Sequence, residues 1–260
     1  MEYYEIPSFT RTNLVKHAFS GRKGGFSQGK YSTLNLSFFT EDKSDNVLEN
    51  RRKFCTELGI DLDSIVCAEQ VHGEHIYNVA ETDQGRGAYN RDSAIPATDA
   101  LITKDKGVPL VAFFADCVPI FFLDPVQKVI AIAHAGWRGT VAKIAAKTAQ
   151  TLFAEYGTES RNLLVGIGPS IGPCHYQVDK PVINRIEEAF PEKSSILLTE
   201  RKNGFAQLNL WEANRQQLLA VGVPSANITV AGLCTYCMQE RFFSHRAGML
   251  GRQAAVIMLK

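Results

Sequence analysis

Two apolar runs joined by a short turn constrain the fold of this chain more than any other feature. The first run covers residues 109–123, PLVAFFADCVPIFFL, and the second covers residues 128–135, KVIAIAHA. The residues between them, Asp124-Pro125-Val126-Gln127, place proline at the second position of a turn. The runs are too short and too interrupted to cross a bilayer. We therefore predict a buried hairpin, which argues against a purely parallel sheet.

Other segments predict helices and strands around this hairpin. Helices are expected at 45–58, where Ser44 or Asp45 can cap and Gly59 can end the helix, and at 140–156, 180–189 and 208–221. Strand-like runs occur at 14–20, 65–73, 100–103, 163–168, 228–232 and 254–259. The polar, glycine-rich residues 80–98 are expected to form a mobile loop. This mixture predicts an α/β or α+β fold with a substantial sheet core.

Composition excludes several classes of protein. The formal net charge is +1, so no overall field favours nucleic acid or an acidic membrane surface. The first residues, MEYYEIPSF, lack the basic-then-apolar pattern of a signal peptide. Six cysteines in a chain of 260 residues without a secretion signal are expected to be free thiols in the cytoplasm. The sequence carries no signal for the oligomeric state.

Cys117 and His134 lie on the two arms of the predicted hairpin. With the turn centred between residues 125 and 126, they are direct cross-strand partners, and their Cβ atoms would lie roughly 4.5–5.5 Å apart on one face. Either residue alone is common in a core. Facing each other, they are as consistent with a metal site as with a buried core pair, and His72 of QVHG is the candidate for the third ligand. Two imidazoles and a thiolate leave a fourth position open, as in catalytic zinc sites, although copper accepts the same ligands.

Eight short motifs distributed along the chain are shared with a known family. In order they are GGFSQGKYSTLNLS, QVHG, ATDALIT, ADCVPIFFLD, AHAGWRGT, GIGPSIGPCHYQVD, CTYC and FFSHRA. This ordered set, which covers nearly the whole chain, resembles the YfiH/YlmD family, also called the laccase-domain or polyphenol oxidase family.

The resemblance implies both a fold and an activity. The fold would be a single domain over residues 1–260, with packed mixed β-sheets flanked by helices in α/β/β/α layers. Members are described as zinc-dependent enzymes that phosphorolyse adenosine, inosine and methylthioadenosine to the base and a ribose 1-phosphate, and that also deaminate adenosine. An older description calls them copper polyphenol oxidases. Carried over by motif, the catalytic metal ligands would be His72, Cys117 and His134.

Phosphorolysis requires a group that binds phosphate. The turn Gly136-Trp137-Arg138-Gly139 is expected to open a helix at Thr140, so backbone N–H groups and Arg138 would hold an anion there. Arg246 and Arg51 are the alternatives, although Arg51 is also consistent with a solvated helix surface. His175 is a candidate substrate contact or proton carrier beside the metal. Each of these residues also has a purely structural interpretation.

Three further patterns have competing interpretations. The pair Cys234-x-x-Cys237 has no second pair in the sequence and is expected to be structural. Phe242 or Phe243 would either stack on a purine or belong to the core. His72-x-Glu74 together with the C-x-x-C pair imitates the signature of zinc nucleoside deaminases, which would make Glu74 the general acid/base.

Two other activities remain open. A copper polyphenol oxidase would need a histidine-rich cluster, for which six histidines are few. A cysteine hydrolase would use Cys117 as the nucleophile and His134 as the base.

Overall fold

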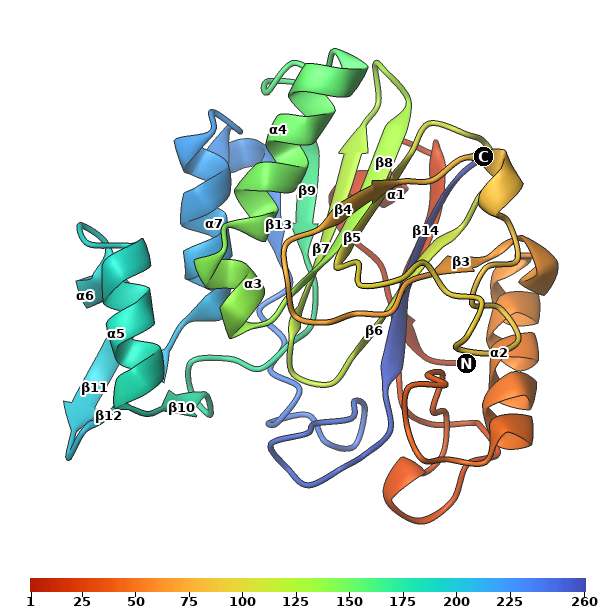
Figure 1. Ribbon diagram of the computed structural model, residues 1–260, viewed down its shortest axis with the longest axis horizontal. Helices are drawn as coiled ribbons and strands as arrows, with labels where there is room; N and C mark the ends of the chain where they lie inside the picture. Colours follow the sequence, from red (N-terminus) through yellow and green to blue (C-terminus); the bar gives the residue numbers. More distant parts are fainter.

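The structure is a computed structural model that describes all 260 residues, and its strands form three sheets (Figure 1). The five-stranded sheet has, in spatial order, β1 (Tyr3–Tyr4), β2 (Val15–Ser20), β14 (Gln253–Leu259), β6 (Leu110–Phe114) and β3 (Val66–Cys67). The six-stranded sheet has β13 (Ile228–Val230), β9 (Leu164–Ile167), β7 (Val118–Asp124), β8 (Val129–Ala135), β5 (Ala100–Thr103) and β4 (Ile76–Asn78). The small sheet has β10 (Gln177–Val178), β12 (Phe205–Leu208) and β11 (Leu198–Lys202).

Seven α-helices accompany the sheets. They are α1 (Pro7–Thr10), α2 (Ser44–Leu58), α3 (Trp137–Val141), α4 (Ile144–Tyr156), α5 (Lys180–Ala189), α6 (Ser194–Leu197) and α7 (Leu210–Ala220). Four 3-10 turns complete the chain, η1 (Gly29–Tyr31), η2 (Leu62–Ser64), η3 (Glu81–Asp83) and η4 (Ser225–Asn227). None of the helices has the length and apolar character needed to span a membrane.

The two large sheets pack face to face between layers of helices, in the expected α/β/β/α order (Figure 1). Alternate side chains of β7 show this arrangement. Phe121 and Leu123 belong to the apolar cluster between the two sheets, whereas Ile120 and Phe122 belong to the cluster shared with α4, α5 and α7. A third cluster joins the five-stranded sheet to α2. Because neighbouring clusters share strands, we infer that residues 1–260 form one domain.

The predicted hairpin is present as β7 and β8, but residues 110–114 of its first arm form β6 in the other large sheet. The register of the hairpin also differs from the prediction. Pro119 pairs with His134 and Asp124 pairs with Val129, so the turn holds four residues and Cys117 is not the direct partner of His134. The turn is wider because Asp124 Oδ1 accepts hydrogen bonds from the backbone N–H groups of Val126 and Gln127. The difference is two residues, and since side chains alternate with a period of two, Cys117 and His134 still face the same side.

Other elements were predicted with mixed success. Helix α2 has the expected bounds and ends at Gly59, which adopts the left-handed conformation with φ 59°, but no side chain caps its start. The helix expected at 140–156 is two helices, divided at Lys143, whose φ is +67°. The strand expected at 65–73 is limited to β3, and the small sheet was not predicted.

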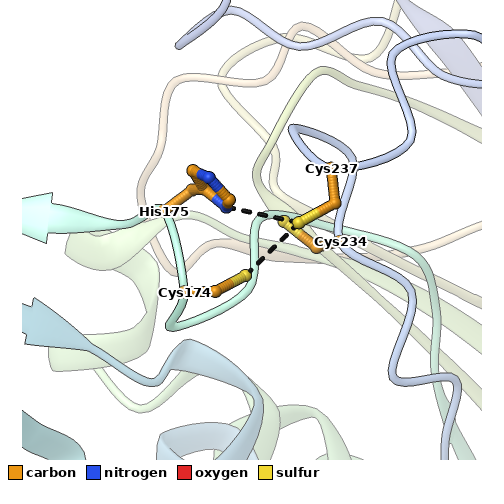
Figure 2. A group of neighbouring side chains, drawn as sticks. All are labelled: Cys174, His175, Cys234 and Cys237. Carbon is orange, nitrogen blue, oxygen red and sulfur yellow. Dashed lines mark hydrogen bonds between the residues drawn. The ribbon is translucent and has the colours of Figure 1, made fainter.

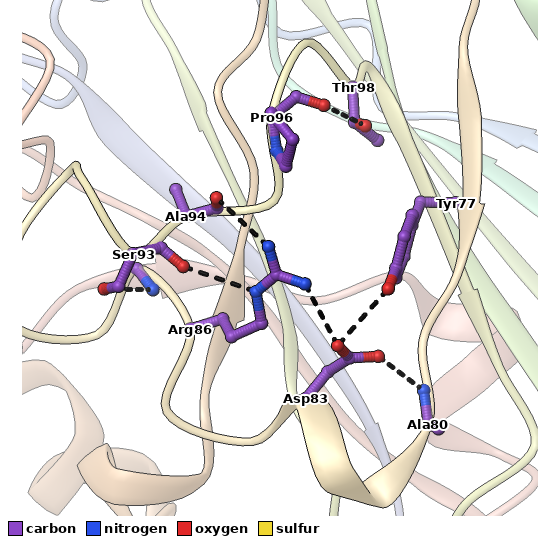
Figure 3. A network of polar contacts seen from close by, with 9 residues as sticks. Tyr77, Ala80, Asp83, Arg86, Ser93, Ala94, Pro96 and Thr98 are labelled. Atoms are coloured by element: carbon purple, nitrogen blue, oxygen red, sulfur yellow. Dashed lines mark hydrogen bonds and ion pairs between the residues drawn. The ribbon is translucent and has the colours of Figure 1, made fainter.

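The segment 80–98, expected to be a mobile loop, is tied together by polar contacts (Figure 3). Asp83 accepts hydrogen bonds from the Tyr77 hydroxyl at 3.3 Å and from the Ala80 backbone N–H at 3.0 Å, and its carboxylate pairs with Arg86 at 3.2 Å. Arg86 also donates to the carbonyl oxygens of Ser93 and Ala94. These contacts give no support to the expected mobility.

Candidate active site

Three side chains converge at one edge of the interface between the two large sheets. His134 lies near the end of β8, Cys117 immediately precedes β7, and His72 lies in the turn that follows β3. Their ligand atoms all lie within 4.8 Å of one another, close to the roughly 3–4.5 Å that a tetrahedral zinc site requires. His134 is buried, Cys117 is half-buried and His72 is exposed, so the cluster is reachable from solvent.

The backbone is strained at one of these residues and immediately before another. His72 has φ 61° and Asp116, which precedes Cys117, has φ 83°. Both values lie in the left-handed region, which is costly for non-glycine residues and is often retained at functional sites. The Asp116 side chain stabilises its own conformation, because it accepts hydrogen bonds from the Thr235 hydroxyl at 2.7 Å and from the Arg246 backbone N–H at 2.7 Å. Asp116 thus orients the chain at Cys117 and does not join the cluster.

The carboxylate that joins the cluster is Asp99, which sequence reasoning missed. Its Oδ1 lies 2.8 Å from Nδ1 of His134, and the backbone N–H groups of His72 and Gly73 donate to the same carboxylate at 3.0 and 2.7 Å. This contact assigns the proton to His134 Nδ1 and leaves Nε2 free to act as a ligand. Asp99 therefore orients two of the three residues, His134 through its ring and His72 through its backbone.

Gly136 allows the three side chains to approach one another. A Cβ atom at this position would lie 3.0 Å from Cys117 Sγ and 3.1 Å from His72 Cδ2. A side chain there would therefore press on two of the three candidate ligands.

The cluster also perturbs the pKa values of its members. Burial disfavours the Cys117 thiolate, but the charge and hydrogen bonds of His134 and His72 lower the pKa of Cys117 to about 6. Burial likewise disfavours the His134 imidazolium, but Cys117 and Asp99 raise its pKa to about 9. Burial opposes ionisation of Asp99, and the hydrogen bond from His134 nevertheless brings its pKa below the usual value. Cys117 is thus poised as a thiolate, the form that binds metals.

A cavity of about 310 Å³ adjoins the cluster. Besides the three cluster residues, the residues that line it include Gln70, Phe39, His245 and Arg252. The Gln70 side chain is fixed by two hydrogen bonds to the backbone of Phe113, at 2.8 and 2.9 Å. A nucleoside-sized molecule would fit a cavity of this volume.

None of the three arginines predicted to bind phosphate lines this cavity. Arg138 is exposed and lies over the ring of Trp137 at 4.5 Å, and the helix begins at Trp137, not at Thr140. Arg246 is exposed and donates to the carbonyl oxygen of Gln177 at 2.9 Å.

Arg51 was expected on a solvated surface, and that expectation is wrong. Its side chain is buried, and its Nε donates to the carbonyl oxygen of Leu36 at 2.7 Å. The guanidinium lies 4.3 Å from the Phe38 ring centroid and 4.7 Å from that of Phe113. Burial of Arg51 is supported by backbone carbonyl groups, which accept from its Nε and Nη1, and by the two aromatic faces, whereas Nη2 makes no hydrogen bond.

The arginine that the structure brings to the cavity is Arg252, which immediately precedes β14 and was not considered from the sequence. Its Nη1 donates to the carbonyl oxygens of Leu250 and Gly251 at 2.8 and 2.9 Å, which fixes the side chain. Of the two phenylalanines that line the cavity, Phe113 is buried and Phe39 is 36% exposed. Phe242 and Phe243 are core residues, as one of the two interpretations proposed.

His175 lies away from His72, Cys117 and His134. The structure places it with Cys174, Cys234 and Cys237, and its ring stacks on Tyr236 with 4.3 Å between ring centroids. His72 and the Cys234-x-x-Cys237 pair, which together imitate the deaminase signature, therefore belong to two different clusters. Glu74 is exposed and pairs with Lys147, which gives it no role at the candidate site.

The donor set at the cavity fits a transition metal. One thiolate and two imidazoles suit zinc or copper, and the absence of carboxylate ligands disfavours magnesium and calcium. Asp99 supplies the hydrogen bond that metal-binding histidines usually make with their second nitrogen. The residues present thus fit a metal ion bound by His72, Cys117 and His134.

Comparison with known proteins assigns the family. Residues 16–260 match the family described as multi-copper polyphenol oxidoreductase laccase. This chain belongs to that family. This laccase-domain chain is similar to the purine nucleoside phosphorylase YlmD of Geobacillus stearothermophilus, which is 41% identical over 91% of this chain and 87% of its own length. It is also similar to adenosine deaminase RL5, from an unknown prokaryotic organism, which is 33% identical over 88% of this chain and 87% of its own.

A solved structure confirms the laccase-domain fold. The YfiH protein of Bacillus licheniformis superposes with a TM-score of 0.95 at 36% identity, and the match covers 99% of this chain and 96% of that one. The resemblance inferred from the eight motifs is therefore confirmed, as is the mixed α/β fold that it implied.

Proposed function

We propose that this chain is a zinc-dependent purine nucleoside enzyme that phosphorolyses adenosine, inosine and methylthioadenosine and deaminates adenosine. The observation that carries the proposal is the convergence of His72, Cys117 and His134 beside a cavity of about 310 Å³. Three protein ligands would leave one position of a tetrahedral zinc ion open. Relatives that extend over most of the chain are named purine nucleoside phosphorylase and adenosine deaminase, which supports the substrate class. Six thiols without disulfide partners suit the cytoplasm, where we expect the enzyme to act.

The metal ion would be held by the two imidazoles and the thiolate, and when bound it would supply Lewis acidity to an oxygen in the cavity. We favour zinc over a set of copper ions. Multi-copper oxidation requires several histidine-rich sites, and the two potential metal clusters of this chain contain only three of its six histidines, His72, His134 and His175.

Residues around the cavity suit both reactions. In phosphorolysis a phosphate oxygen forms a bond to the ribose C1′ as the bond from C1′ to the base nitrogen breaks. Arg252 would hold the phosphate, and the exposed face of Phe39 would stack on the base. In deamination water adds to the purine C6 and ammonia leaves, and His245 is the cavity residue suited to carry a proton to the leaving group.

The test combines metal analysis with product analysis. Purified protein is analysed for zinc and copper and is then incubated with each nucleoside, with and without inorganic phosphate. We expect zinc in the protein and phosphate-dependent release of the free base, with inosine forming from adenosine in both conditions. Oxidation of phenols by a copper-loaded protein that leaves all three nucleosides unchanged would refute the proposal.

A cysteine hydrolase is the second candidate, because one specific observation favours it. Cys117, His134 and Asp99 form a chain in which the pKa of the thiol is lowered to about 6 and a carboxylate orients the imidazole. Chelation separates the candidates. A zinc enzyme loses its activity with chelator and regains it with zinc, whereas a cysteine hydrolase retains its activity with chelator.

A further inference from the structure

A second cluster of potential metal ligands lies outside the candidate active site. Cys174 and His175 belong to the loop between β9 and β10, and Cys234 and Cys237 belong to the loop after β13. The four side chains point toward one another (Figure 2), and their ligand atoms all lie within 4.8 Å. No sequence pattern links the two loops, which are about sixty residues apart. The structure thus supplies the second pair that the C-x-x-C motif lacked.

Two of the separations within the cluster lie close to those of a tetrahedral metal site. The sulfur atoms of Cys174 and Cys237 are 3.6 Å apart, and Cys237 Sγ lies 3.3 Å from Nδ1 of His175. With zinc bonds of about 2.3 Å to sulfur and about 2.0–2.1 Å to nitrogen, the edges of a tetrahedron are about 3.8 Å and about 3.5 Å. Both separations are within about 0.2 Å of these edges. A disulfide would require about 2.05 Å between the sulfur atoms.

The surrounding backbone holds the ligands in place without the metal. The two loops pair as a short parallel bridge, in which Ser170 N–H donates to the Leu233 carbonyl oxygen and Thr235 N–H donates to that of Ser170, each at 3.1 Å. The N–H group of Gly172 donates to Cys234 Sγ at 3.2 Å, a contact that stabilises a thiolate. The His175 ring is fixed by stacking on Tyr236.

We propose that Cys174, His175, Cys234 and Cys237 bind one zinc ion as a closed structural site. Three thiolates and one imidazole are a common structural zinc set, and four protein ligands leave no position for a substrate. Neither the family description nor the names of the relatives assigns a metal to these residues. The proposal does not depend on the proposed function, because it concerns a separate set of ligands.

The position of this site suggests what it stabilises. The same two loops hold Asp116, since Ile171 N–H donates to its carbonyl oxygen at 2.9 Å and the Thr235 hydroxyl donates to its Oδ1 at 2.7 Å. Asp116 precedes Cys117 and has φ 83°. A metal ion that joins the two loops would therefore also stabilise the strained backbone next to the candidate active site.

The test counts metal ions in matched variants. Reduced protein is incubated with excess zinc, freed of unbound metal and analysed. We expect two zinc ions per chain in the parent, one in Cys117→Ala, one in Cys237→Ser and none in the double variant. The control, Cys55→Ala, removes a thiol that belongs to neither cluster and should retain two. A parent protein that binds a single zinc ion, lost in Cys117→Ala and retained in Cys237→Ser, would overturn the proposal.

A second measurement remains informative if Cys237→Ser does not fold. In Cys117→Ala loaded with cobalt, any absorption from thiolate-to-cobalt charge transfer must arise from the second cluster. We expect this absorption. We also expect the bound metal to protect three thiols from alkylation, and a chelator to abolish that protection. If reduced Cys117→Ala shows neither signal, the site does not exist. If the thiols are unprotected and the unreduced protein contains a bond between Cys174 and Cys237, the cluster is a redox pair and the proposal is wrong.

Discussion

Cys117 is the residue on which the proposed active site depends most directly. We expect Cys117→Ala to lose the metal of this site and to lower nucleoside turnover about 100-fold or more, since one of three ligands is removed. The fold should be retained, because the substitution deletes a single sulfur atom at a half-buried position. Metal analysis, steady-state kinetics and thermal unfolding check this. A variant with unchanged turnover and a full complement of active-site zinc would contradict it.

Asp99 should control metal affinity without contacting the metal. In Asp99→Asn the His134 ring loses its charged acceptor, so zinc affinity at the active site should fall about 10–100-fold. Competition with a chelator measures this affinity. Asp83→Asn is a matched control, because Asp83 also accepts a backbone N–H and a side-chain hydrogen bond, in a loop outside the cavity lining. Equal affinity in Asp99→Asn and the parent would exclude the proposed orienting role.

Arg252 should distinguish the two proposed reactions. We expect Arg252→Ala to depress phosphorolysis roughly tenfold or more relative to deamination, about 1.4 kcal/mol, because only phosphorolysis requires the anion. Arg138→Ala is the matched control, since Arg138 is exposed and outside the cavity lining. The ratio of the two rates is the measurement, because loss of folded protein lowers both rates equally. A changed ratio in Arg138→Ala alone would restore Arg138 as the phosphate ligand.

The candidate site residues that could be identified from the sequence differ in one respect from those that could not. His72, Cys117 and His134 carry side chains of the types that bind transition metals, whereas Asp99, although it also stands in a motif, ATDALIT, does not. Asp99 meets His134 because β5, which begins at Ala100, lies beside β8, and Arg252 reaches the cavity because β14 lies beside β6. Both contacts depend on which strands are neighbours, and no local pattern in the sequence specifies that order.

At the scale of elements, the hairpin shows why an inexact register still placed two residues correctly. The predicted pairing was wrong by two residues, and a shift of two preserves the face on which each side chain lies. A shift of one would have separated Cys117 from His134. The partners of the C-x-x-C motif, Cys174 and His175, could not be predicted from strand periodicity in this way, because they belong to a loop about sixty residues away.

The junction between β8 and α3 should be intolerant of any side chain at Gly136. In Gly136→Ala the new Cβ would lie 3.0 Å from Cys117 Sγ and 3.1 Å from His72 Cδ2, so the ligands must move by a few tenths of an ångström. We expect weaker zinc binding at the active site and lower turnover, with zinc at the second cluster unchanged. Metal analysis at limiting zinc checks this. Equal loss at both clusters would indicate general unfolding and not a local clash.

At the scale of the whole molecule, we expect the layers to form without either metal. Three apolar clusters hold the sheets and helices together, and of the two sets of ligands, which lie at the ends of strands and in loops, only Cys117 packs against one of these clusters. The family resemblance predicted this layer order, whereas the sequence patterns alone predicted only a mixed fold. The small sheet of β10, β11 and β12 was missed because its strands are short and, apart from Phe205, polar at their exposed positions.

Zinc should therefore raise the stability of a protein that is already folded. Metal-free protein is expected to keep its secondary structure and to unfold cooperatively. Free zinc at 100 times the dissociation constant of one site adds about 2.7 kcal/mol, which corresponds to a rise of roughly 5–10 °C in Tm for a chain of this size. Thermal unfolding of stripped protein, with and without zinc, measures the rise. Cys117→Ala should retain the part of the Tm rise that comes from zinc bound at the second cluster. A stripped protein without native circular dichroism would show instead that the layers depend on the metals.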